Sequence, residues 1–328
     1  MCVLILVVSS YYRGNKLEID NINAKKCVKI KHKLYICNHI VKDVYNLFME
    51  NWTTIIKPQN RLWEVDLKEL WRYRDLFVMY VKRDIITQYK QTILGPLWFL
   101  IQPALTTIMY MIVFGGIAGI PTDGVPQPLF YLAGICIWQY FADCLNKTSQ
   151  TFVTNQNIFG KVYFPRLVAP LSTVTAGLVK LFIQFLLFAV VYVYFVLSGV
   201  NVCPNWYALL FPVLIVMIAG LALGFGIIVS SLTTKYRDLT ILFTFVVQLW
   251  MYGTPVIYPL STITNETLKF AMMLNPITAI VETFKFGFLG VGEFSWGLLG
   301  YSFAFMLVVL TIGIVIFNKV QRSFMDTV

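Results

Sequence analysis

The chain is poor in the residues that most enzymes use for acid–base and metal chemistry. Histidine occurs only twice among 328 residues, at His32 and His39, far from the long apolar segments. No Ser-His-Asp or Cys-His arrangement can therefore be built in or beside those segments. Cys27, His32, Cys37 and His39 have a loosely metal-like spacing. A zinc knuckle would want a cysteine three residues before Cys27, where Ala24 stands, so we expect no metal.

A nucleotide-binding loop is missing as well. The phosphate-binding pattern G-x-x-x-x-G-K-[ST] needs glycines for close backbone approach and a hydroxyl for magnesium. The only Gly-Lys pair is Gly160-Lys161, with Asn155 in place of the first glycine and Val162 in place of the hydroxyl. We therefore expect this chain to bind no cofactor itself. Any work it does must draw on another polypeptide or on an ion gradient.

Ionisable residues are scarce inside the apolar segments. Gradient-driven carriers usually place such residues there as relays. Here Asp143 lies near the end of the second segment and Lys180 lies within the third. Lys180 either extends to the cytoplasmic interface or lines an aqueous route for an anionic substrate, and the sequence leaves both open. The scarcity argues against a proton-coupled carrier.

Long apolar segments are what the chain has in abundance. Hydrophobic residues make up 58% of it, compared with about 45–50% in a soluble domain. A hydrocarbon core of about 30 Å is crossed by about 20 residues of helix, the structure that pairs backbone polar groups in lipid. We predict an all-α integral membrane protein with six transmembrane helices. The predicted spans are Leu97–Ala118, Leu129–Leu145, Leu167–Leu197, Trp206–Leu232, Leu239–Tyr258 and Trp296–Phe317.

Positive charge alternates between the connections. Lysine and arginine occur in the connections 146–166 and 233–238 and in the C-terminal tail. The connections 120–128 and 198–205 contain neither residue, and the connection 262–295 is slightly acidic. Because basic loops stay on the cytoplasmic side, the pattern predicts that both termini are cytoplasmic.

The N-terminal region differs from the rest in composition. Residues 1–60 are polar and lysine-rich, without a clear helical period, and we expect a basic, disordered extension. An alternative is that residues 1–48 reflect the choice of start site, with Met49 as the true start. Sixteen of the 26 lysines and arginines lie before Gly95. Cytoplasmic orientation and anionic lipid headgroups explain this charge better than nucleic acid does. Residues 61–328 are predicted to form one transmembrane domain.

Short helices are predicted on either side of the spans. A helix over about 67–90 has a basic polar face and is expected to lie in the membrane interface. Its expected apolar face consists of Leu67, Leu70, Trp71, Val78, Val81 and Ile85. After the fifth span, the stretches Leu268–Leu274 and Ile277–Gly290 are too short or too charged to cross the membrane. We predict two short re-entrant helices on the outer face, with a plain surface loop as the alternative.

Several stretches of the chain resemble the permease subunits of bacterial ABC exporters for polysaccharides, the O-antigen, capsule and teichoic-acid group. The likeness covers about Trp52 to the C-terminus and is stronger for the six stretches together than for any one. These stretches are RDIITQYKQTILGPLW (83–98), IFGKVYFPR (158–166), KYRDL (235–239), QLWMYGTPVIYP (248–259), LNPITAIVETFKFGFLG (274–290) and QRSFMDTV (321–328).

The resemblance implies a homodimer in the cell inner membrane with two copies of a separate ATP-binding-cassette ATPase, which would hold ATP and Mg. This chain would then be no enzyme. A lipid-linked polysaccharide would pass outward through a channel at the dimer interface, surrounded by membrane lipids. The residues that the resemblance places against the ATPase are Arg83, Lys90, Asn157, Phe159, Lys161, Tyr163, Phe164 and Arg166. We expect Phe159→Ala and Arg166→Glu to uncouple ATP hydrolysis from export without lowering permease abundance.

Aromatic residues near the proline-rich outer elements are candidates for a surface that stacks sugar rings. Membrane anchoring or packing against lipid is the alternative for each of them. The candidates for the channel and the outer gate are Tyr110, Phe114, Trp250, Tyr252, Pro255, Tyr258 and Pro259.

Three other functions were weighed. The same architecture could export a lipid or a hydrophobic drug. A membrane glycosyl or acyl transferase would need clustered Asp, Glu or His at the membrane face, which the sequence does not contain. An ion channel would need rings of charge or filter carbonyls, and no such pattern is evident.

Overall fold

The structure is a computed structural model that describes residues 67–327 except positions 91, 163, 201, 203 and 237. Side chains are described from position 68 to position 321. All described elements belong to one compact unit, Arg61–Val328. The predicted extension 1–60, the cysteines and histidines within it, and the predicted coupling residue Tyr163 lie outside the described residues.

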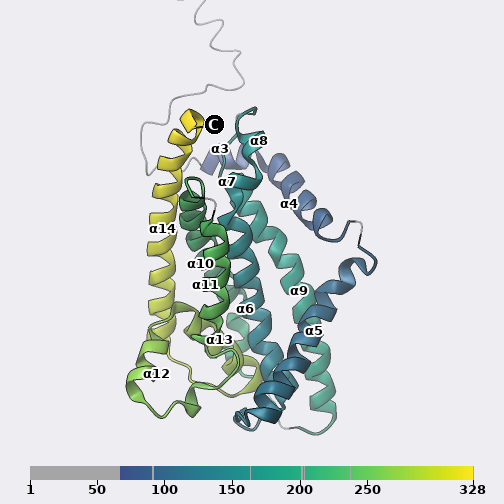
Figure 1. Ribbon diagram of the computed structural model, residues 1–328. Helices are drawn as coiled ribbons and strands as arrows, with labels where there is room; N and C mark the ends of the chain where they lie inside the picture. The colour runs from purple at the N-terminus through teal and green to yellow at the C-terminus, as the bar shows by residue number, and fades with distance from the viewer. Residues whose placement is uncertain are drawn as a thin grey trace, which may run out of the picture. The chain divides into compact units, whose positions relative to one another are not determined.

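The described part of the chain is helical and contains no strand, which confirms the predicted all-α class (Figure 1). Short 3-10 turns η1 (Gly95–Leu97), η3 (Trp206–Leu210) and η4 (Leu260–Thr262) lie before α5, before α10 and after α11. A π-helical stretch, η2 (Met111–Ile117), continues α5. The α-helices are α3 (Leu67–Arg72), α4 (Arg74–Tyr89), α5 (Trp98–Tyr110), α6 (Gln127–Ser149), α7 (Thr151–Thr154), α8 (Gln156–Phe159), α9 (Val168–Leu197), α10 (Phe211–Thr233), α11 (Leu239–Tyr252), α12 (Glu266–Met273), α13 (Pro276–Leu289) and α14 (Trp296–Thr327).

The chain is a multi-pass membrane protein. Within the described residues, five segments are long and apolar enough to cross a bilayer, namely Gly95–Ile117, Gln127–Ser149, Val168–Leu197, Trp206–Thr233 and Trp296–Gln321. The predicted span Leu239–Tyr258 is wrong at its end, because α11 stops at Tyr252 after 14 residues. That is about 21 Å of helix. Pro255 lacks a backbone N–H and cannot continue the ladder, so the last apolar residues form a turn instead.

The least apolar of these five segments is the most buried. Helix α6 lies at the centre of the bundle and packs against α5, α9 and α10 (Figure 1). Most of α6 is buried, whereas the first span, α9 and α14 leave most of their apolar windows exposed. Lipid favours apolar side chains, so polar and small residues turn toward neighbouring helices. The low hydropathy of α6 is therefore consistent with its burial among other helices, although the most apolar segment, Trp206–Thr233, is also more than half buried.

Glycines bring the central helices close together. A Cβ atom at Gly313 of α14 would lie 2.9 Å from the carbonyl oxygen of Gly224 of α10. A Cβ at Gly226 would lie 2.6 Å from the Cβ of Thr148 of α6. Any larger residue at these positions would separate the helices, so the glycines set the spacing of α6, α10 and α14.

Helix α4 packs one side against the bundle and leaves part of the predicted apolar face exposed. Helix α4 packs against α9, and Leu76, Phe77 and Tyr80 face the core. Trp71 and Val78, both assigned to the apolar face, are 71% and 48% exposed. The segment carries apolar side chains on more than one side, and the sequence did not indicate which side meets the bundle. The exposed side is available to the membrane interface.

The two ends of the bundle are formed by different elements. Helices α7 and α8 and the last turns of α14 lie at one end, called here the elbow end (Figure 1). Helix α12 and the connection 118–126 lie at the opposite end, called the loop end, and α13 is the buried helix beside it. The two predicted short helices after the fifth span are present as α12 and α13. Asn275, Pro276 and Gly290 cap α13 as a helix start and stop require.

Candidate functional site

The elbow that joins α6 to α9 is held by an aromatic cluster. Phe159 is 2% exposed, and its ring centroid lies 5.9 Å from that of Phe152 and 5.6 Å from that of Phe164. Phe152 also packs on Phe317 of α14 at 4.8 Å, and Phe164 packs on Tyr80 of α4 at 5.9 Å. The cluster therefore ties the elbow to both α4 and α14.

The residues predicted to couple to an ATPase divide into two groups. Phe159 and Phe164 point into the aromatic cluster and offer no outer surface. Asn157 and Lys161 are exposed, together with Ile158 between them. An outside partner at the elbow would therefore contact the exposed group, and the buried phenylalanines would hold that surface in place.

Arg166 belongs with the inward group. Its side chain is 8% exposed, and Nη1 donates a hydrogen bond to the carbonyl oxygen of Gln321 at 2.8 Å. Its guanidinium also lies 5.6 Å from the centroid of the Phe159 ring. Burial lowers the pKa of Arg166 below its ordinary value, although a guanidinium with so high an ordinary pKa remains charged at neutral pH. Arg166 thus fastens the end of the elbow to α14.

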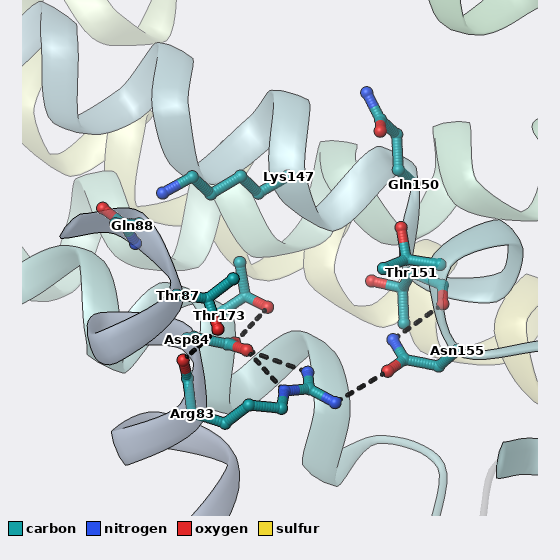
Figure 2. A pocket seen from close by; sticks show the side chains of 10 residues that line it. Arg83, Asp84, Thr87, Gln88, Lys147, Gln150, Thr151, Asn155 and Thr173 are labelled. Atoms are coloured by element: carbon teal, nitrogen blue, oxygen red, sulfur yellow. Dashed lines mark hydrogen bonds and ion pairs between the residues drawn. The ribbon is translucent and has the colours of Figure 1, made fainter. Parts of the chain in front are cut away.

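A polar cleft of about 410 Å³ opens beside the elbow, between α4, α6, α7 and α9 (Figure 2). Arg83 donates to Asp84 Oδ1 at 2.8 Å and to Asn155 Oδ1 at 3.3 Å, and Asp84 Oδ2 accepts from Thr173 at 3.3 Å. This network joins α4 to the elbow and to α9. The cleft is lined by Arg83, Asp84, Thr87, Gln88, Lys147, Gln150, Thr151, Thr154, Asn155 and Thr173.

A second, much smaller cavity adjoins the cleft and holds the charges inside the bundle. Lys180 of α9 donates to Asp143 Oδ2 of α6 at 2.5 Å, and both residues line this cavity. Lys147 and Thr173 line both spaces. Lys180 therefore forms an ion pair between two helices, and its two open interpretations stay predictions. Predicted coupling residue Lys90 is exposed after α4 and does not line the cleft.

The loop end contains a fully buried lysine that the sequence analysis did not single out. Lys285 of α13 is 1% exposed, and its Nζ donates to the carbonyl oxygen of Pro255 at 2.6 Å. The same Nζ lies 3.7 Å from the centroid of the Phe130 ring, which stabilises a cation further. Lys285 thus connects α13, the turn after α11 and the start of α6.

Glu282 lies one turn before Lys285 and is also buried, at 2% exposure. Its Oε2 accepts a hydrogen bond from the backbone N–H of Glu293 at 3.1 Å, which ties α13 to the connection that leads into α14. Glu293 in turn pairs with Lys269 of α12. The i, i+3 spacing of an acid and a base on an otherwise apolar helix was the available signal. In the sequence, these charges indicate only that the segment does not cross the membrane.

The predicted gate residues are partly brought together. Tyr110 donates to Met251 Sδ at 3.4 Å, and its ring lies 5.4 Å from that of Phe114. Tyr258 donates to the carbonyl oxygen of Tyr252 at 2.6 Å, which closes the turn after α11. Pro255 and Pro259 are buried within this turn. Their position beside α12 and α13 matches the predicted place, and their role as a gate stays a prediction.

Trp250 lies apart from the other gate candidates. Its ring packs edge-on against Phe141 of α6 at 5.5 Å and against Phe225 of α10 at 5.3 Å. It is therefore a packing residue between α11 and the centre of the bundle in this single chain.

Comparison with known proteins identifies relatives for most of the described helices. Residues 75–289, from α4 to the end of α13, match the family described as ABC-2 type transporter. The chain is 27% identical over 221 residues to the O-antigen export system permease protein RfbA of Myxococcus xanthus, covering 67% of this chain and 82% of that protein. It is 28% identical over 256 residues to the protein of the same name from Klebsiella pneumoniae, covering 77% and 94%. Against the polysialic acid transport protein KpsM of Escherichia coli the identity is 23% over 254 residues, covering 75% and 93%.

Proposed function

The chain belongs to the ABC-2 type transporter family, and on that premise we propose that it is the membrane-spanning subunit of an ATP-driven exporter of a lipid-linked polysaccharide. The observation that carries the proposal is the match to permeases named for O-antigen and polysialic acid transport over most of their length. A permease of this kind transports its substrate and is no enzyme. The proposed substrate class, a polysaccharide, is inferred from the names of these relatives.

The drive comes from a separate ATPase that docks on the elbow. The sequence has no phosphate-binding loop, so the nucleotide and Mg belong to that partner. Asn157, Ile158 and Lys161 are part of the exposed surface of the elbow, which a partner could contact. Through the aromatic cluster, force applied there would reach α4 and α14, since packed side chains transmit displacement.

The elbow end faces the cytoplasm of the cell, and the protein lies in the inner membrane. The basic connections 146–166 and 233–238 lie at this end, as the positive-inside bias requires. The C-terminal turns of α14 lie there too, so the C-terminus is cytoplasmic. The loop end then faces outward, where the exported glycan leaves.

The channel forms between two copies of the chain. Helices α5 and α11 meet through Tyr110 and Met251, and both expose large apolar side chains, among them Ile108, Ile241 and Phe245. Such a surface suits either lipid or a second copy. A polymer needs a continuous path, and two permeases with two ATPases supply one that a single bundle does not.

Reconstitution tests the proposal. The permease and its cognate ATPase, placed in vesicles, should move a lipid-linked glycan outward only when ATP is supplied. A hydrophobic dye and a labelled phospholipid serve as competing substrates in the same vesicles. Glycan transport that exceeds dye and phospholipid transport supports the proposal. ATP-driven movement of the dye or phospholipid alone would replace it with a lipid or drug exporter.

A further inference from the structure

The cleft at the elbow end holds a cation, Lys147, that forms no hydrogen bond or ion pair with a described side chain. Lys147 stands in the last turn of α6 and lines the cleft. No hydrogen bond or ion pair joins its ammonium to the described residues. In Figure 2 the dashed bonds connect Arg83, Asp84, Thr87, Thr151, Asn155 and Thr173, and Lys147 lies outside this network. The nearby Asp143 carboxylate is already engaged by Lys180.

The charges around the two adjoining spaces favour an anion. Arg83, Lys147 and Lys180 are positive, and Asp84 and Asp143 are negative, so one positive charge is left over. Both carboxylates are held by hydrogen bonds to Arg83, Thr173 or Lys180. A ligand with a negative charge would therefore meet Lys147 without displacing an existing pair. The amide of Gln88 lies on the same side of the cleft as the Lys147 ammonium (Figure 2) and can supply an N–H donor.

The position of the cleft favours an anionic ligand that is anchored in the membrane. One wall is α4, and the exposed Val78 and Met79 of this helix suit the membrane interface. The other walls are the ends of α6 and α9, which are membrane spans. At this depth the anions of a bilayer are the phosphates of its lipids. A volume of about 410 Å³ is larger than a lone phosphate needs and falls in the range of small-molecule sites.

We propose that this cleft binds the phosphate group of a membrane-anchored lipid, with Lys147 as its counter-ion and Gln88 as a hydrogen-bond donor. The phosphate belongs either to the phosphate-bearing end of the lipid-linked glycan or to an ordinary phospholipid. In the first case the inference rests on the proposed function and identifies where the substrate is first held. In the second case the site binds a structural lipid.

Binding to the full chain in complex with its ATPase tests the site. The complex is placed in nanodiscs of phosphatidylcholine, and two short-chain probes are titrated, a polyprenyl diphosphate carrying one sugar and a phosphatidylglycerol. Lys147→Gln should weaken binding of the recognised probe about tenfold, the factor that corresponds to ~1.4 kcal/mol. Lys147→Arg should restore binding because it returns the charge.

A matched control separates the site from general surface charge. Lys235→Gln removes one exposed lysine at the same end of the bundle, outside the cleft, and should leave binding unchanged. Gln88→Leu tests a different wall and should weaken binding less than Lys147→Gln does. The proposal is overturned if Lys147→Gln binds like Lys235→Gln, or if neither probe binds the unaltered complex.

The two probes assign the source of the phosphate. Preference for the diphosphate assigns the cleft to the exported lipid-linked substrate, and equal binding of both probes assigns it to lipid phosphate in general. Glycan export by the same variants keeps the two proposals apart. Normal export with unchanged binding in Lys147→Gln overturns the site alone. Absence of glycan export by the unaltered complex, with intact binding, overturns the function alone.

Discussion

Lysines at the two ends of the bundle stand in opposite environments. At the loop end, Lys285 is buried, bonded to the Pro255 carbonyl and placed against the Phe130 ring. At the elbow end, Lys147 lines an open cleft and is bonded to none of the described side chains. A buried charge must be satisfied inside the protein, whereas a charge in an open cleft keeps water and can exchange it for a ligand. The loop-end lysine is thus part of a fixed internal contact, whereas the elbow-end lysine is free to meet the ligand proposed for the cleft.

The largest contrast is expected between alanine substitutions of these two lysines. Lys285→Ala should lower the free energy of unfolding by about 4 kcal/mol, because it leaves a buried carbonyl without its donor and Glu282 without a neighbouring cation. Lys147→Ala should change it by less than about 0.5 kcal/mol, as surface substitutions do. Unfolding of both purified variants in detergent measures the difference. Equal stability of the two variants would contradict the claim that Lys285 is structural and Lys147 is not.

The next largest effect is expected at the elbow core. Phe159→Ala should cost about 3 kcal/mol of stability, because it opens a cavity among Phe152, Phe164 and Arg166. This corrects the expectation that the variant uncouples transport at normal abundance, since the buried ring makes lower abundance the first effect. Asn157→Ala, on the exposed side, should keep the melting temperature and impair ATPase-dependent export. A stable, abundant Phe159→Ala variant would contradict this description.

An intermediate effect is expected for the ion pair inside the bundle. Asp143→Asn and Lys180→Met should each cost about 2 kcal/mol, the range of hydrogen bonds that involve a charged group. The double variant should cost less than the sum of the two, because neither residue is left without its partner. A double-mutant cycle on melting in detergent gives the coupling. Strict additivity would show that the pair is not formed.

The smallest effects are expected for single hydroxyl groups that link segments at each end. Thr173→Val removes a bond to Asp84 in the cleft wall, and Ser261→Ala removes the bond to Asp123 at the loop end. Each should lower stability by about 1 kcal/mol or less. Thr173→Val should in addition alter lipid-probe binding at the cleft, because Asp84 is then held only by Arg83. Ser261→Ala should leave that binding unchanged.

Much of the fold could be predicted because the bilayer restricts the options. Spans such as Val168–Leu197 and Trp296–Gln321 are long apolar runs, and lipid accepts them only as helices. The starts and stops of α13 were visible in Asn275, Pro276 and Gly290. The end of α11 was misplaced because hydropathy continued past Tyr252 while the proline had already ended the helix.

The candidate site was predicted less completely. The elbow was located, but the sequence did not distinguish exposed Asn157 from buried Phe159, since neither residue type fixes the direction of a short helix. The cleft depends on residues from α4, α6, α7 and α9 that are up to about ninety positions apart, from Arg83 to Thr173. The hydrophobic periodicity of one segment does not indicate which residues of other segments lie beside it. Lys285 was missed for the same reason, as its partner Pro255 lies on another element.

Composition and periodicity by themselves determined that this protein is helical, lies in a membrane and lacks a nucleotide-binding loop, because lipid and phosphate each demand particular residue types over short stretches. Only the tertiary structure decided which charged side chains are buried and which are accessible to solvent. Lys147 and Lys285 are the same residue type in the sequence. The helices packed around each one determine that Lys285 is bonded to the Pro255 carbonyl and that Lys147 lines an open cleft.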